Sequence, residues 1–104
     1  MTSPNPTPIR RLVRMTFRED ALPEFMELFH RSKQQIRNRP GCLHLELWQD
    51  AGAPHICTTF SIWESQEYLD QYRRSELFGQ VWPATKTLFA EAPVAFSVQQ
   101  VVVV

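Results

Sequence analysis

The chain has 104 residues, 43% hydrophobic and 21% charged, which favours one globular domain with a small apolar core. Eleven basic and eleven acidic side chains cancel, so the charge gives no indication of nucleic acid or an anionic membrane as partner. No apolar run is long enough to span a bilayer, and MTSPNPTP lacks the features of a signal peptide. We expect a cytoplasmic protein with a disordered lead-in at residues 1–8 and one domain over residues 9–104.

The first predicted element is a strand with the sequence IRRLVRMTF. Side chains alternate with period two, which places Arg11, Val13 and Met15 on one face and Leu12 on the other. A helix follows, with Asp20 as the expected N-cap and its apolar residues at spacings of three and four. The segment RPG ends this helix near Arg37.

Two further strands, CLHLELW and HICTTFSIW, are joined by a turn at DAGAP. If Leu45 pairs with Phe60, the apolar faces of both strands coincide, and Trp48 and Trp63 lie on the opposite face. Cys42 and Cys57 are not opposite each other in this register, so reduced thiols are expected.

The C-terminal part reads as two helices and a strand. Ser65 and Ser75 are expected N-caps, and PVAFSVQQVVVV is strand-like because of its valines. Pro83 should kink the second helix or restart it near Trp82, with Gly79 tolerating the distortion. The order βαββαβ predicts an α+β, ferredoxin-like fold with an antiparallel sheet and both long helices on one face.

The other sheet face would carry Leu12, Trp48, Trp63 and the valine-rich tail without cover from the same chain. Such side chains are poor choices for contact with water, so we expect a homodimer with the sheets face to face. A monomer with one solvated sheet face is the alternative.

Three segments carry a resemblance to a known family. The segments PGCLHLEL, FSIWES and YLDQYRRSELF are similar to the antibiotic biosynthesis monooxygenase family of dimeric α/β barrels. The resemblance covers almost the whole chain after Pro8, and the frame PG-C-L…W-E-S is its most specific part. The family includes cofactor-free oxygenases of aromatic polyketides, quinol oxygenases, haem-degrading enzymes and members with no established reaction.

The resemblance implies a pocket between the helices and the sheet inside each subunit, and a C-terminal strand that is swapped or extended across the dimer. Its expected floor and walls are Val13, Met15, Phe25, Phe29, Leu45, Phe60, Phe78 and Trp82. Many family members have histidines at Tyr72 and near Leu77, so the usual general base is missing. Tyr72 and Arg11 are the candidate catalytic residues, with Arg14 as a weaker third.

The first functional hypothesis is a cofactor-independent monooxygenase that oxidises a quinol or polycyclic phenol with O2. An arginine would stabilise the substrate anion and a tyrosine would give a proton to the peroxide. A small-molecule-binding or stress-related dimer without turnover is the alternative. Haem binding or degradation is a third reading, disfavoured because Trp82 and Val13 replace the histidine and asparagine of haem-degrading members.

No cofactor or metal is expected. The sequence has no dinucleotide or phosphate-binding fingerprint. His30, His44 and His55 have no second ligand at metal-binding spacing, so surface or interface positions are their default assignment.

Overall fold

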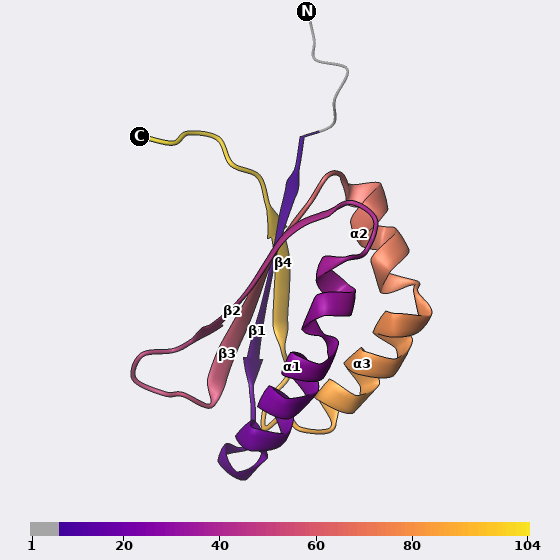
Figure 1. Cartoon of the computed structure of the whole chain (residues 1–104). Coiled ribbons are helices and arrows are strands. Elements are labelled where there is room, and N and C mark those ends of the chain that lie inside the picture. Colours follow the sequence, from indigo (N-terminus) through magenta and orange to yellow (C-terminus); the bar gives the residue numbers. More distant parts are fainter. Residues whose placement is uncertain (1–6) are drawn as a thin grey trace, which may run out of the picture.

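The computed structural model describes residues 7–104, which form a four-stranded antiparallel sheet with helices on one face (Figure 1). The elements in chain order are β1 (Ile9–Thr16), a 3-10 turn η1 (Glu19–Ala21), α1 (Leu22–Arg37), β2 (Cys42–Gln49), β3 (Ile56–Trp63), α2 (Gln66–Arg73), α3 (Glu76–Lys86) and β4 (Val94–Val98). The strand order is β2-β3-β1-β4. The predicted α+β, ferredoxin-like architecture is confirmed. The predicted lead-in lies outside the described residues, apart from Thr7 and Pro8.

The helix boundaries follow from local chemistry. Ser65 and Ser75 accept hydrogen bonds from the backbone N–H groups of Tyr68 and Phe78, so both predicted N-caps are confirmed. Asp20 is not a cap, because η1 takes up this segment and α1 begins at Leu22, with Ala21 as its N-cap. The helix ends at Arg37, as predicted.

Helix α3 runs through Pro83 without the predicted break near Trp82. Pro83 removes one backbone donor, and the carbonyl that loses its partner is that of Gly79. Gly79 is exposed, so this carbonyl can accept a hydrogen bond from water instead. The loss is therefore small enough for the helix to continue.

The hairpin register differs from the predicted one by one residue. Leu45 pairs with Ser61 and Glu46 pairs with Phe60, and the ladder is irregular between Cys42 and His44. A shift by one residue exchanges the two faces of a strand. Phe60 therefore lies on the face away from the helices.

The same shift places Trp63 against the helices, where it is 1% exposed. It forms a buried cluster there with Cys42 and Leu69, so its predicted position on the uncovered face was wrong. A second cluster holds Met15, Phe17, Ala21, Phe25, Cys57 and Leu88. Both cysteines are buried and unpaired, in agreement with the expected reduced thiols.

The C-terminal strand is shorter than predicted. β4 ends at Val98, and the valines at residues 101–104 follow as an exposed, non-strand segment. In the part of the chain that the structure describes, no helix combines the length and hydrophobicity needed to cross a membrane.

Candidate functional site

A cavity of about 180 Å³ lies between the sheet and the three helices. Its lining comes from every strand and every α-helix: Arg11, Val13, Met15, Phe25, Leu28, Phe29, Ser32, Ile36, Leu45, Thr59, Ser61, Trp63, Leu69, Tyr72, Arg73, Phe78, Val81, Trp82, Thr85 and Ala95. The cavity therefore lies on the helix-covered face of the sheet, where an intrasubunit pocket was expected.

Most of the predicted pocket residues meet in this cavity. The structure brings together Arg11, Val13, Met15, Phe25, Phe29, Leu45, Tyr72, Phe78 and Trp82. The exception is Phe60, which stacks on Trp48 across the sheet, with ring centroids 5.1 Å apart. The register of β3 explains this error, because Phe60 and the cavity lie on opposite faces.

Aromatic side chains form one continuous wall. Trp63 stacks on Tyr72 at 5.0 Å, Tyr72 meets the edge of Phe78 at 5.3 Å, and Phe78 stacks on Trp82 at 5.8 Å. Such offset-stacked and edge-to-face pairs are favourable and hold the rings in place. The cavity therefore offers a pre-formed surface against which a flat apolar ligand can stack.

The polar groups of the sheet gather in one row across the strands. Arg11 pairs with Ser61 of β3 on one side and with Ser97 of β4 on the other. The Arg11 guanidinium donates a hydrogen bond to Ser97 Oγ at 3.2 Å, and the Trp63 indole N–H donates to Ser61 Oγ at 3.0 Å. These contacts fix Arg11 and the Trp63 ring at the cavity end nearest α2.

Tyr72 lies beside this row, on α2. Burial raises the pKa of its phenol to about 12; the nearby Cys42 thiol adds to the rise, and Arg39 opposes it. The phenol is therefore protonated at neutral pH. Tyr72 can donate a hydrogen bond or a proton to a ligand, but it cannot serve as a base.

The raised pKa of Tyr72 can be measured in a Tyr68→Phe variant, where Tyr72 is the single tyrosine. Absorbance at 295 nm should titrate near pH 12, above the ordinary value of 10. The folded state holds this proton more tightly than the unfolded state, so the free energy of unfolding should fall as pH rises from 10 to 12. A midpoint near 10, with circular dichroism showing a folded protein, would contradict the burial of Tyr72.

The cavity lining contains no histidine, cysteine, aspartate or glutamate. Within residues 7–104, no three such side chains gather in a way that could hold a metal ion. A phenol that ionised in this cavity would have to release its proton to water, and Arg11 and the neighbouring Arg73 would stabilise the resulting anion.

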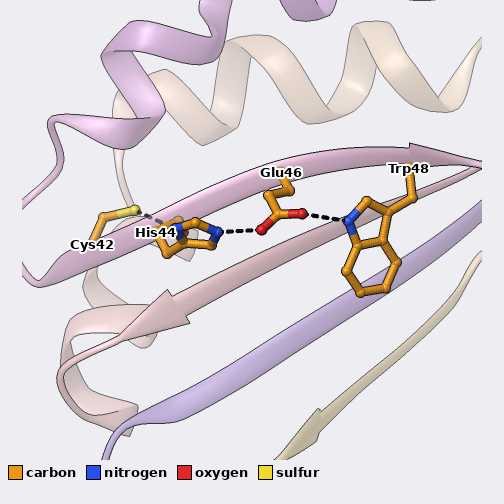
Figure 2. A network of polar contacts seen from close by, with 4 residues as sticks. All are labelled: Cys42, His44, Glu46 and Trp48. Atoms are coloured by element: carbon orange, nitrogen blue, oxygen red, sulfur yellow. Dashed lines mark hydrogen bonds and ion pairs between the residues drawn. The ribbon is translucent and has the colours of Figure 1, made fainter.

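A polar network on the open face of the sheet lies apart from the cavity (Figure 2). His44 and the Trp48 indole both contact the Glu46 carboxylate, and these hydrogen bonds lower the pKa of Glu46. Arg14, the weaker catalytic candidate, is also on this face, so it does not reach the cavity. His30 lies instead beside Lys33, with His30 Nδ1 3.0 Å from Lys33 Nζ.

Sequence reasoning missed three lining residues that shape the polar end: Ser61, Trp63 and Arg73. Ser61 and Trp63 were missed because the predicted register of β3 placed them on the opposite face of the sheet. Arg73 follows Tyr72 directly in α2, and charge in that position is also typical of a solvated helix face. The one indication in the sequence was that Arg73 directly follows Tyr72, a candidate site residue.

The fold is ferredoxin-like, with an aromatic-walled cavity between the sheet and the helices. The sequence model of the antibiotic biosynthesis monooxygenase family matches residues 8–82, and the chain belongs to this family. No curated protein matches the chain.

Solved structures share the fold at low sequence identity. A conserved protein from Methanosarcina mazei Go1 has a TM-score of 0.87 and 21% identity, with 90% of this chain and 93% of that chain covered. An antibiotic biosynthesis monooxygenase has a TM-score of 0.84 and 17% identity, with 89% and 98% covered. Rv0793 from Mycobacterium tuberculosis has a TM-score of 0.84 and 19% identity, with 91% and 96% covered.

Proposed function

We propose that the protein is a cofactor-independent monooxygenase that oxidises a small quinol with O2. The observation that carries this proposal is an aromatic-walled cavity with Arg11 and the protonated Tyr72 at one end. The apolar wall suits a flat ring, the guanidinium suits its phenolate, and the phenol supplies a proton. The name of the family supports the reaction class.

The volume of the cavity indicates the size of substrate that it can hold. An apolar protein cavity of about 150 Å³ holds one benzene ring. At about 180 Å³, the cavity has room for a ring with small substituents. A polycyclic phenol would not fit wholly inside this volume, so the geometry favours a quinol.

The reaction needs no external reductant, because the quinol supplies all the electrons. A positive charge near the ring favours loss of a phenol proton to water, and the phenolate passes one electron to O2. The semiquinone and superoxide then combine, forming a carbon–oxygen bond at a ring carbon. Protonation of the peroxide, loss of the ring hydrogen as a proton and cleavage of the O–O bond give a hydroxyquinone and water.

Two side chains have distinct roles in this scheme. Arg11 stabilises the phenolate by charge and is held in place by Ser97. Tyr72 protonates the peroxide, and the proton from the ring carbon restores it through solvent. The stacking of Tyr72 on Trp63 keeps the phenol next to the bound ring.

Oxygen consumption with a panel of hydroquinones, with a metal chelator present, tests the proposal. We expect uptake of O2 with formation of a hydroxyquinone, and a fall in kcat of at least about tenfold for Tyr72→Phe. Tyr68→Phe, the same change at a tyrosine outside the cavity, should retain the rate. A flat oxygen trace across single-ring quinols would contradict the function, and full activity of Tyr72→Phe would remove Tyr72 from the mechanism.

A ligand-binding protein without turnover is the second candidate. The lack of a histidine or carboxylate in the lining favours it, because the cavity then has no group that accepts a proton at neutral pH. Quenching of Trp63 and Trp82 fluorescence by quinols, without oxygen uptake, would support this reading.

The functional unit is proposed to be a homodimer that pairs the open faces of two sheets. This open face, as observed, carries the apolar side chains Leu12, Trp48, Phe60, Ile62, Val94, Phe96 and Val98. Trp48 is 42% exposed and Phe96 is 46% exposed. Figure 1 shows the helices on the opposite side of the sheet, which leaves this face free for a second copy.

Light scattering coupled to size exclusion should give twice the 12.2 kDa of one chain. Phe96→Asp places a charge against its own symmetry-related surface and should yield monomers. Gln35→Asp, on the exposed side of α1, should leave the mass unchanged. A monomer mass for the unmodified protein at micromolar concentration would reject the dimer.

A further inference from the structure

Two arginine side chains share the polar end of the cavity without an acidic partner. Arg11 and Arg73 both line the cavity, and its lining contains no carboxylate. Across residues 7–104, the acidic groups that form ion pairs do so with Arg18, Arg31, His44 and His55. No acidic side chain among residues 7–104 therefore forms an ion pair with the two arginines at the cavity.

The two charges interact. Partial burial lowers the pKa of Arg11, and the charge of Arg73 lowers it further. Arg73 is exposed, so it lies where the cavity opens to solvent, whereas Arg11 is half-buried on the central strand β1. Like charges in a partly dehydrated site repel each other, and a bound anion would relieve this repulsion.

The anion must also fit an apolar site. Beyond the row of Arg11, Ser61 and Ser97, the wall is formed by aromatic side chains such as Phe29, Phe78 and Trp82. A free inorganic anion would make no apolar contact with this wall. A neutral aromatic compound would bring no negative charge to the two guanidinium groups.

We propose that the cavity binds an aromatic acid, a ring of the dihydroxybenzoate type whose carboxylate lies between Arg11 and Arg73. The fork of an arginine matches a carboxylate with two parallel hydrogen bonds, so these side chains would fix the acid group while the ring stacks in the apolar part. This inference rests on the proposed function for the identity of the ring as a quinol. It adds a fixed negative charge to that substrate class.

The test compares ligands that differ in the acid group alone. Binding of 2,5-dihydroxybenzoate, its methyl ester and hydroquinone is measured without oxygen, through quenching of tryptophan fluorescence or by calorimetry. We expect the acid to bind at least about tenfold more tightly than either neutral compound, since hydrogen bonds between a guanidinium and a carboxylate are stronger than those between neutral groups. Added salt should weaken binding of the acid more than binding of the ester.

Variants assign the preference to the two arginines. Arg11→Gln and Arg73→Gln should each reduce the affinity for the acid about tenfold or more and leave the affinity for the ester within about twofold. Arg74→Gln is the matched control, because Arg74 is exposed at the end of the same helix and does not line the cavity. Circular dichroism establishes that each variant is folded, and Arg11→Lys retains the charge if Arg11→Gln is unstable.

Each outcome bears on the proposal. Equal affinities for the acid and the ester, no binding of the acid at millimolar concentration, or equal losses for both ligands in the arginine variants would overturn it. Tight binding of the acid without oxygen uptake in air would support the anion site and reject the monooxygenase. Turnover of neutral quinols without preference for the acid would support the monooxygenase and reject the anion site.

Discussion

Gly41→Ala is expected to lower the free energy of unfolding by about 4 kcal/mol, a large part of the stability of a small domain. Gly41 has φ +79°, a left-handed conformation that costs a residue with a Cβ about 1–2 kcal/mol. A Cβ at this position would also overlap Cγ and Cβ of Tyr68, which belong to the base of the side chain and cannot move far. Such overpacking typically adds about 1–3 kcal/mol. Urea unfolding followed by circular dichroism measures the change.

The chain supplies a control with the same substitution and the opposite sign. Gly79 lies inside α3, and a Cβ added there meets no atom within 4 Å. Gly79→Ala should stabilise the protein by about 0.5–1 kcal/mol, because alanine is the better helix former. A loss below about 1 kcal/mol for Gly41→Ala would show that the tight turn between α1 and β2 is not formed as described.

Trp63→Ala is expected to cost about 3–5 kcal/mol and to disorder the polar end of the cavity. The indole is 1% exposed, donates a hydrogen bond to Ser61 and stacks on Tyr72. Its loss opens a void that the neighbouring sheet and helix can fill only in part. Urea unfolding measures the stability. The kcat of the proposed quinol oxidation shows whether Tyr72 is still held in place.

Trp63→Phe tests whether the effect of Trp63 on Tyr72 comes from filling the buried volume or from the stacked ring. The smaller ring should restore part of the lost stability and keep a stacking partner for Tyr72. If the cavity has the described shape, millimolar indole should also raise the stability of Trp63→Ala, because it fills the void. A loss below about 1.5 kcal/mol in Trp63→Ala, with an unchanged rate, would show that Trp63 is not buried against Tyr72.

Much of the fold could be predicted because its signals are local. Ser65 and Ser75 each satisfy a backbone donor at a helix start, and the segment after Arg37 cannot continue a helix. Period two in β1 gave the right faces, because one side of this strand mixes arginines with Leu12. Features of this kind depend on neighbours in sequence alone.

The register of β3 could not be predicted, because this strand is apolar on both faces. Phe60 and Ile62 face away from the helices, while Cys57 and Trp63 face them. Alternation then does not select a face. The irregularity between Cys42 and His44 shifts the start of β2, and the sequence shows no glycine or proline there to signal it.

The candidate site was predicted where it depends on β1, on aromatic stripes and on Tyr72, and missed at Ser61 and Trp63 of β3 and at Arg73 of α2. Arg11, Phe29 and Trp82 follow from periodicity and resemblance. Arg73 could not be distinguished from a surface charge, because its role depends on the distance between α2 and the sheet. This distance is set by packing of Leu69 and Trp63, which a one-dimensional pattern does not contain.

The burial of both sulfhydryl groups limits their reaction with oxidants. Cys57 is 0% exposed and Cys42 is 6% exposed, and burial raises the pKa of each thiol. Oxidants such as hydrogen peroxide attack the thiolate, so a protonated thiol shielded from solvent reacts slowly. If the proposed oxidation takes place, peroxide that escapes from an incomplete turnover would therefore leave both sulfurs intact, and the protein would resist its own by-product.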